Sequence, residues 1–323
     1  MKAMLCKELG HPSKMVLEEV ASPVPGKKEV LVSIKACSVN FPDTLMVQGL
    51  YQFKPSMPFA PGCDIAGVVK AVGEEVENLK VGDEIFGMVQ YGGFAEEVIA
   101  PAHTVFPKMP SMDFNIAASF MMAYGTSYHA LKDRAHLKAG ETLVVLGASG
   151  GVGIAAVELG KMMGARVIAC ASTDTKLELC KKYGANETIN YTDEDLKKRI
   201  KELTDGKGAD VVYDPVGGAY TEAALRATGW QGRFLIVGFP AGIAKIPMNL
   251  PLLKGCQICG VFYGSFAARS PKQNMKNSME LIQLYNEGKI KPYVHKVYAL
   301  EDSRQALIDM MDRKILGKII IQP

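Results

Sequence analysis

The stretch TLVVLGASGGVGIAAVELG, residues 142–160, decides the fold class of this chain. An apolar run leads to Gly147, and three closely spaced glycines then open a helical pattern of apolar residues. The segment RVIACAS, residues 166–172, again has strand character and precedes the helical pattern TDTKLELCKKYGA. Strands that alternate with helices in this way predict βαβ units and a parallel sheet covered by helices on both faces.

The glycines after the first strand indicate a dinucleotide-binding turn. They let the chain turn sharply, so that backbone N–H groups at the helix start can approach a pyrophosphate. Ala148 stands where the G-x-G-x-x-G pattern usually has its first glycine, but the preceding strand, the helix and the next strand are all present. We expect cofactor contacts from Ala148, Ser149, Gly150, Gly151, Val152 and Gly153.

The end of the next strand predicts which dinucleotide binds. An NAD site generally carries Asp or Glu there, to bind the ribose 2′-hydroxyl. Ala171 and Ser172 occupy this position, and Lys176 follows one helical turn later. Nothing there repels a 2′-phosphate, and a hydroxyl and an ammonium can receive it, so the sequence predicts NADPH rather than NADH. We interpret Asp174 as the N-cap of the following helix.

The length of 323 residues predicts two domains, because one hydrophobic core rarely serves so long a chain. The first third alternates short β-type runs with Gly/Pro turns, which is typical of a mostly antiparallel β domain. We expect residues 122–264 to form the dinucleotide-binding domain. Residues 265–323 are too few to fold alone and are expected to return to the first domain, residues 1–121.

Composition and charge exclude several classes of protein. The net charge of +3 is small and the basic residues are interspersed with acidic ones, so nucleic acid is not an expected partner. No secretory signal or membrane span is recognisable, and we expect a cytoplasmic protein. The seven cysteines are widely spaced and predict no disulfide framework. Cys256 and Cys259 lie in a β-type run and are interpreted as buried thiols.

Motifs along the whole chain resemble one family. In order, they are VNFPDTLMVQGLY, PGCDIAGVV, VGDEIFG, YGGFAEE, YGTSYHAL, GASGGVG and VVYDPVGG. They resemble the medium-chain dehydrogenase/reductase superfamily and, within it, the zinc-free NADPH quinone oxidoreductase branch related to ζ-crystallin. This resemblance implies a GroES-like, mostly β catalytic domain and a Rossmann cofactor domain with a doubly wound parallel sheet. It also implies a homodimer paired through the apolar strand CQICGVFYG.

The resemblance implies that no metal is bound. Zinc-dependent relatives ligate their catalytic zinc with a cysteine in the segment equivalent to CSVNFPD, a histidine equivalent to Cys63, and a third residue near the start of the cofactor domain. In this chain Asn40 takes the first place, and the third falls in SFMMAYGTS, which offers no ligand. One candidate ligand cannot make a tetrahedral site. The closely spaced cysteines of a structural zinc lobe are also missing between Cys63 and Cys170.

Without a Lewis acid, alcohol dehydrogenation loses its main catalytic contribution. We therefore expect hydride transfer from NADPH to an acceptor that is already electrophilic, a quinone or another conjugated carbonyl. Asn40 can donate a hydrogen bond to the ribose or the carbonyl, and Tyr51 can donate a proton or stabilise an enolate oxygen. The resemblance also implies cofactor contacts from Thr126, Tyr191, Gly238, Phe239, Phe262 and Lys318, with Tyr191 and Lys318 near the 2′-phosphate end.

Two alternatives stay open. Tyr51 takes the place of the proposed catalytic tyrosine of zinc-free enoyl thioester reductases, so an enoyl thioester or enone reductase is the first. An acyl-CoA substrate should favour a basic rim, and the first domain has no dense Lys/Arg cluster, which favours the quinone. The second alternative is an NADPH-binding structural or RNA-binding protein with little catalysis.

Overall fold

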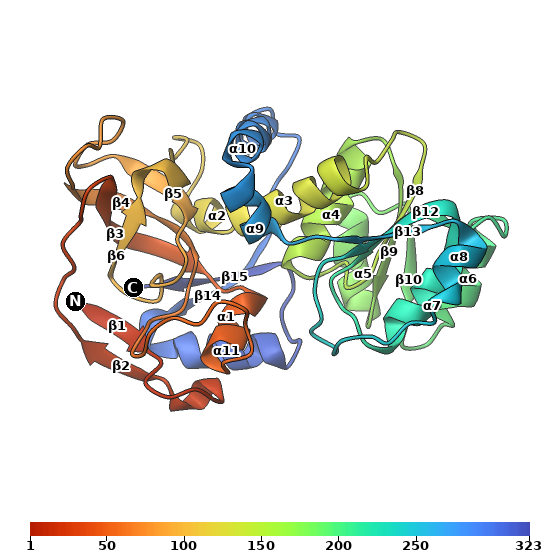
Figure 1. Cartoon of the computed structure of the whole chain (residues 1–323), viewed down its shortest axis with the longest axis horizontal. Helices are drawn as coiled ribbons and strands as arrows, with labels where there is room; N and C mark the ends of the chain where they lie inside the picture. Colours follow the sequence, from red (N-terminus) through yellow and green to blue (C-terminus); the bar gives the residue numbers. More distant parts are fainter. The chain divides into compact units, whose positions relative to one another are not determined.

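The computed structural model describes all 323 residues and divides the chain into two compact units (Figure 1). Unit 1 contains Met1–Met122 and Pro292–Pro323, and unit 2 contains Ala123–Lys291. One unit is built mainly from antiparallel strands and the other from a parallel sheet with helices, which confirms the predicted fold class. None of the helices has the length and apolarity to span a bilayer.

Unit 1 is organised around a seven-stranded sheet with the strand order β14-β15-β3-β4-β5-β7, to which β6 adds by pairing with β3. Its core contains apolar side chains from the sheet and its helices, among them the fully buried Val32, Ile65 and Ile321. The strands are β1 (Lys2–Leu5), β2 (Val16–Glu19), β3 (Glu29–Ser38), β4 (Asp64–Val72), β5 (Glu84–Met88), β6 (Glu97–Pro101), β7 (Val105–Pro107), β14 (Val294–Ala299) and β15 (Lys318–Gln322). The helices are α1 (Phe41–Val47), α2 (Phe114–Ala118) and α11 (Ser303–Met311).

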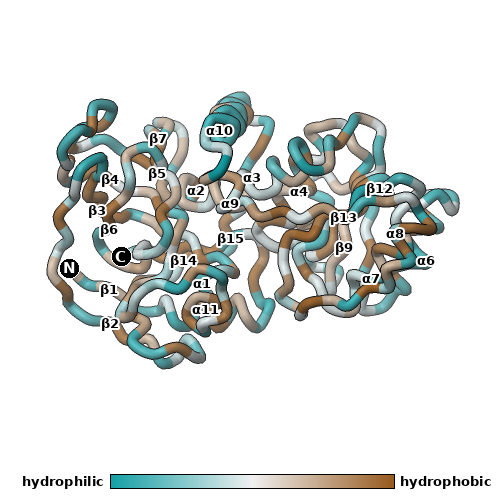
Figure 2. Tube along the Cα trace, in the orientation of Figure 1, coloured by the Kyte–Doolittle hydropathy of each residue, from teal (hydrophilic) through white to brown (hydrophobic).

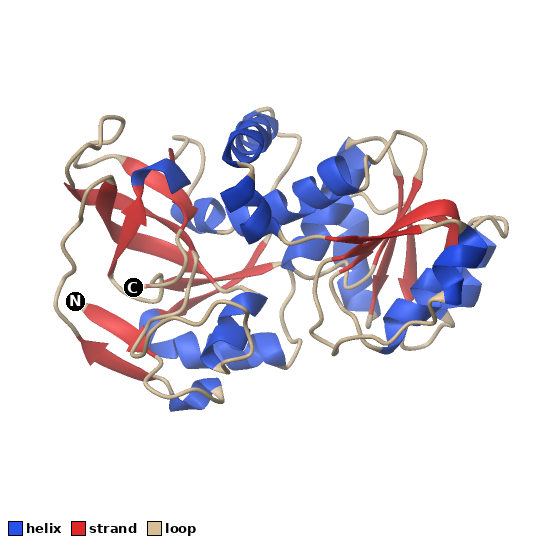
Figure 3. Cartoon of the chain, in the orientation of Figure 1, coloured by secondary structure: helices blue, strands red, loops and turns tan.

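Unit 2 contains a six-stranded parallel sheet with the order β10-β9-β8-β11-β12-β13, and helices lie on both of its faces (Figure 3). Its strands are β8 (Thr142–Val145), β9 (Arg166–Ala171), β10 (Glu187–Asn190), β11 (Ala209–Asp214), β12 (Thr228–Ile236) and β13 (Gln257–Gly260). The helices are α3 (Met121–Tyr128, which begins at the end of unit 1), α4 (Gly151–Met162), α5 (Asp174–Lys182), α6 (Leu196–Leu203), α7 (Ala219–Ala227), α8 (Asn249–Lys254), α9 (Tyr263–Arg269) and α10 (Pro271–Asn286).

The chain order reverses between β8 and β11, which are neighbours in the sheet although β9 and β10 lie between them in sequence. Such a reversal opens a crevice at the carboxyl ends of the strands, where ligands of doubly wound sheets bind. Strand β8 is apolar throughout its buried part, as expected for a strand covered on both faces. The glycine-rich turn follows β8 directly and therefore lies at this crevice.

The second domain boundary corrects the prediction from sequence. Unit 2 runs to Lys291, so the boundary expected at 264/265 lies at 291/292, whereas the first boundary falls beside the expected one. Helix α10 is hydrophilic along most of its visible length (Figure 2). The hydropathy pattern therefore gave no indication of the unit to which it belongs.

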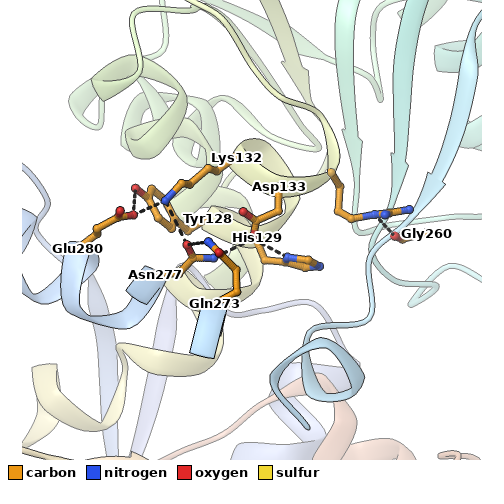
Figure 4. A network of polar contacts seen from close by, with 9 residues as sticks. Tyr128, His129, Lys132, Asp133, Gly260, Gln273, Asn277 and Glu280 are labelled. Atoms are coloured by element: carbon orange, nitrogen blue, oxygen red, sulfur yellow. Dashed lines mark hydrogen bonds and ion pairs between the residues drawn. The ribbon is translucent and has the colours of Figure 1, made fainter. Parts of the chain in front are cut away.

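Polar contacts hold α10 to unit 2 (Figure 4). Asn277 donates to the carboxylate of Asp133 over 2.7 Å, and Lys132 forms an ion pair with Glu280. Lys132 and Asp133 belong to a π-helical turn, His129–Arg134, that continues α3. The predicted boundary was wrong because these contacts join segments far apart in the chain, and sequence periodicity does not reveal such pairs.

Candidate functional site

The glycine-rich turn joins β8 to α4 with little space for side chains. Gly147 has a φ of +54°, in the left-handed region that favours glycine. A Cβ added at Gly153 would lie 2.2 Å from the carbonyl oxygen of Gly147, so the helix packs directly on the turn. Gly150 precedes the helix in an extended conformation, and no side chain caps α4. The first backbone N–H groups of α4 are therefore open to an anionic group, which the helix dipole also favours.

Buried residues within and beside this turn hold it in place. Ala148 and Ser149 are 0% and 5% exposed, whereas Val152 is partly exposed in the first turn of α4. The hydroxyl of Ser127 in α3 donates to the carbonyl oxygen of Val152 over 2.8 Å, and lies 2.9 Å from the hydroxyl of Tyr213. Sequence analysis did not single out Ser127 or Tyr213, because their contact depends on how α3 packs beside β11.

The structure brings three of the predicted 2′-phosphate residues together at the ends of β9 and β10, namely Ser172, Lys176 and Tyr191, whereas Lys318 lies in unit 1. The ammonium of Lys176 donates to the hydroxyl of Ser172 over 3.1 Å. The backbone N–H of Tyr191 donates to the carbonyl oxygen of Ala171, which places Tyr191 beside Ser172. A hydroxyl and an ammonium thus stand where a carboxylate would discriminate against a 2′-phosphate.

The N-cap of α5 differs from the prediction. Thr173 caps the helix by accepting from the backbone N–H of Lys176 over 3.4 Å. Asp174 is the first helical residue, and its carboxylate accepts from the side chain of Asn190 over 3.2 Å. Both residue types form good caps, and the prediction was wrong by one position.

Asp214, at the end of β11, organises two neighbouring loops and was missed by sequence analysis. Its buried carboxylate accepts from the backbone N–H groups of Val216 and Gly217, each over 2.9 Å, and from the hydroxyl of Thr221 over 2.6 Å. The loop that follows β12 is bonded to the same segment through Gly218 and Gly242. Hydrogen bonds therefore join these two loops at the carboxyl ends of β11 and β12.

The remaining cofactor residues predicted in unit 2 differ in exposure. Thr126 lies buried in α3, 7% exposed. Gly238 opens the loop after β12, and Phe239 beside it is 42% exposed. Phe262, which precedes α9, is 52% exposed. The two aromatic rings are therefore accessible to a ligand, whereas little of the Thr126 surface is accessible.

In unit 1, Asn40 and Lys318 lie in contact although 278 positions separate them. Asn40 follows β3 and precedes α1, while Lys318 begins β15, which pairs with β3. The ammonium of Lys318 donates to Oδ1 of Asn40 over 2.5 Å and to the carbonyl oxygen of Val39 over 3.4 Å. Both side chains are buried, 6% and 5% exposed. The cofactor contacts predicted for these two residues stay predictions.

Two buried carboxyl groups lie beside this pair. Asp43 accepts from the backbone N–H groups of Asn40 over 2.7 Å and Gly62 over 2.9 Å, and so joins α1 to the loop before β4. Asp64 begins β4, and its Oδ2 accepts from the hydroxyl of Ser38 over 3.2 Å. Its other oxygen, Oδ1, is buried without a hydrogen-bond partner. The motif PGCDIAGVV thus contributes a buried acid, Asp64, for which sequence analysis predicted no role.

Burial controls the protonation of these groups. It raises the pKa of Asp43 to about 6 and the pKa of Asp64 to about 7. The same desolvation lowers the pKa of Lys318. The ammonium opposes the rise at both carboxyls, so Lys318 makes their ionised forms less costly.

Tyr51 is partly buried and packs against the core of unit 1. Burial raises the pKa of its phenol, and the nearby Cys63 and Asp43 act in the same direction. The hydroxyl is therefore protonated at neutral pH and able to donate. Burial also raises the pKa of the Cys63 thiol well above its usual range, which makes this thiol a poor nucleophile.

The groups around Cys63 do not fit a zinc ion. Zinc requires thiolate, imidazole or carboxylate ligands, usually four in a tetrahedron. Asn40 offers a neutral amide whose oxygen already accepts from an ammonium, and Cys63 is held as a neutral thiol. No group of three or more His, Cys, Asp or Glu side chains is arranged to hold a metal.

Comparisons with known proteins agree with this geometry. Residues 26–111 match the alcohol dehydrogenase GroES-like domain, and residues 151–283 match the zinc-binding dehydrogenase family. The quinone oxidoreductase-like protein 2 homolog of Nematostella vectensis is 37% identical, over 99% of this chain and 88% of its own length. The quinone oxidoreductase of Sus scrofa is 34% identical, over 99% and 97%. Escherichia coli quinone oxidoreductase, solved in complex with NADPH, superposes with a TM-score of 0.95 at 28% identity and full coverage of both chains.

Proposed function

The chain belongs to the quinone oxidoreductase branch of the medium-chain dehydrogenase/reductase superfamily, and on that premise we propose that it is an NADPH-dependent, zinc-independent reductase of quinones or related conjugated carbonyls. The observation that carries the zinc-free chemistry is the contact between Asn40 and Lys318, which places a cation and an amide where a metal would need anionic ligands. A cytoplasmic location and a homodimer are part of the same proposal.

The residues of unit 2 fit NADPH. The backbone N–H groups of the turn from Gly147 to Gly153 would hold the pyrophosphate, since the Gly147–Gly153 approach leaves no room for a Cβ. Ser172 and Lys176 would hold the 2′-phosphate by charge-assisted hydrogen bonds, with Tyr191 beside them. When bound, NADPH supplies a hydride to the acceptor.

The residues of unit 1 would serve the acceptor. Reduction of a quinone to a hydroquinone requires one hydride and one proton. Tyr51 would donate that proton from its hydroxyl to the quinone oxygen, and water would then reprotonate the tyrosinate. Asn40 would donate a hydrogen bond from Nδ2 to the same oxygen or to the ribose of the cofactor. The phenol of Tyr51 is protonated across the physiological range, so the proton is available for transfer.

The test is the loss of NADPH absorbance by metal-stripped protein, with an ortho-quinone and a 2-enoyl thioester offered separately. We expect faster turnover of the quinone, unchanged by added zinc. Tyr51→Phe should lower kcat about tenfold or more, because it removes a proton donor without changing the ring. The matched control is Tyr298→Phe, which removes the hydroxyl that Tyr298 donates to Asp309 in the same unit.

Other results of this assay would support the alternative functions or contradict the proposal. A preference for the thioester would move the assignment to enoyl thioester reductase. Tight NADPH binding with no turnover of either acceptor would contradict the reductase proposal and favour a cofactor-binding protein with little catalysis. Activity that depends on added zinc would contradict the zinc-independent mechanism.

A further inference from the structure

The side-chain amide of Asn40 is held at its oxygen by a group that can only donate. An ammonium has three N–H donors and no acceptor, so the atom of Asn40 that lies 2.5 Å from Lys318 is the carbonyl oxygen Oδ1. The NH2 group must then point the other way. Both residues are more than nine-tenths buried, so water does not compete for this contact.

The opposite end of the amide is directed by Ser38. Nδ2 of Asn40 donates to the carbonyl oxygen of Ser38 over 3.3 Å and to its hydroxyl over 3.2 Å. That hydroxyl in turn lies 3.2 Å from Oδ2 of Asp64 and donates to it. When Asp64 is ionised, the chain of hydrogen bonds from Lys318 through Asn40 and Ser38 to Asp64 therefore has one direction, fixed by a donor at one end and an acceptor at the other.

One N–H of Asn40 is held only weakly. Nδ2 lies 3.7 Å from the sulfur of Cys63, and a thiol sulfur is a poor acceptor. A ligand oxygen that approached Nδ2 would exchange a weak hydrogen bond for a strong one. The donor is thus already oriented before a ligand arrives, and little is lost when it turns to a ligand.

Lys318 does not act here as the partner of an ion pair. Its direct partners are the amide of Asn40 and the carbonyl oxygen of Val39, neither of which carries a charge. Its charge stabilises the two carboxylates at longer range, whereas its hydrogen bond acts on the amide. Substitution of Asn40 removes the hydrogen bond and leaves the charge of Lys318 in place.

We propose that Lys318 is a positioning residue that fixes the amide of Asn40 with Nδ2 directed away from the ammonium, toward Ser38 and Cys63, so that Asn40 serves the reaction only as a hydrogen-bond donor. This inference rests on the proposed function, in which Asn40 contacts the ribose or the acceptor. It differs from the direct cofactor contact that the family resemblance implies for Lys318. In the positioning role, Lys318 acts through Asn40 alone.

A double-mutant cycle tests the proposal with Lys318→Met, Asn40→Ala and the double variant, for which kcat and the Kd of NADPH are measured. We expect Lys318→Met to change the same parameter as Asn40→Ala, by about tenfold or more. The double variant should resemble Asn40→Ala within about twofold, since Lys318 has nothing to orient once the amide is gone. Losses that multiply would overturn the proposal, and so would a raised NADPH Kd in Lys318→Met when Asn40→Ala leaves that Kd unchanged.

Two further variants distinguish a specific loss of activity from a folding defect. Asn40→Asp keeps an oxygen acceptor for Lys318 but has no N–H, so it should fold and lose activity as Asn40→Ala does. Lys296→Met removes a lysine from β14, the strand paired with β15, and should leave both parameters unchanged. Activity retained by Asn40→Asp would show that the donor is not needed and would overturn the proposal.

A measurement without turnover keeps this test separate from the proposed function. Hydrogen exchange of the Asn40 side-chain NH2, followed by 15N NMR in the ligand-free protein, should be about tenfold faster or more in Lys318→Met, because one restraining hydrogen bond is lost. Unchanged exchange would overturn the positioning role. Failure of the wild-type protein to reduce any acceptor would contradict only the proposed function.

Discussion

Replacing Gly153 by alanine should weaken NADPH binding about tenfold while the chain stays folded. The added Cβ would lie 2.2 Å from the carbonyl oxygen of Gly147 and 2.9 Å from two backbone atoms of Ala148, and backbone cannot rotate away as a side chain end can. Overpacking of this kind costs about 1–3 kcal/mol, while alanine in a helix returns about 1 kcal/mol. If the turn opens, the strain is relieved but the turn no longer has the shape that binds the cofactor. A loss of about 1.4 kcal/mol of binding free energy corresponds to a tenfold rise in Kd.

The matched control for this prediction is Gly160→Ala in the same helix. Its Cβ would lie 2.5 Å from a terminal methyl group of Leu143, which can turn aside without moving the backbone. Titration of NADPH fluorescence should give a raised Kd for Gly153→Ala and a Kd within about twofold of wild type for Gly160→Ala. Wild-type affinity in Gly153→Ala would refute the argument that the close packing of this turn shapes the cofactor site.

Three further predictions follow from the charges and the sheet edge. Because burial raises the pKa of Asp64 from 3.8 to about 7, the folded state binds an extra proton, and stability should fall as pH rises from about 4 to about 7. In urea unfolding, Asp64→Asn should reduce this loss of unfolding free energy between about pH 4 and pH 7, by on the order of 4 kcal/mol at most. An unchanged pH dependence would contradict the raised pKa of Asp64. Lys176→Ala should raise the Kd of NADPH about tenfold but hardly change that of NADH, and equal effects on both would argue against a 2′-phosphate site. Strand β13 pairs only with β12, so its other edge should pair with a second chain; a sedimentation mass of one chain at micromolar concentration would exclude the dimer.

The cofactor turn could be predicted from sequence because its determinants are local. Strand, glycines and helix are consecutive, and the Cβ clash at Gly153 shows why glycine is needed there. The approach of Lys176 to Ser172 follows from one helical turn of spacing. The single error in this region was the N-cap, where Thr173 and Asp174 are adjacent and both of a residue type that caps helices.

The unit 1 site could be predicted only as separate residues. Asn40 and Lys318 were both singled out, yet their contact depends on the antiparallel pairing of β15 with β3, which no local pattern specifies. Asp43 and Asp64 were not singled out because an aspartate near a turn is usually exposed, and burial of a carboxyl is a property of the whole unit. The displaced domain boundary has the same cause, since distant polar pairs hold α10 in place.

The presence of an ammonium in the unit 1 site has a further chemical consequence. Two carboxyls buried without a cation would both stay protonated near neutral pH, and Asp64 could then donate to Ser38 instead of accepting from it. The charge of Lys318 lowers the cost of ionising Asp64. The ionised carboxylate can only accept, so the hydroxyl of Ser38 donates to it. Lys318 thus has two separate effects on the hydrogen-bond chain, a direct hydrogen bond at Asn40 and a coulombic effect on Asp64 at the far end. A neutral donor at position 318 could satisfy only the first condition, whereas a buried lysine satisfies both.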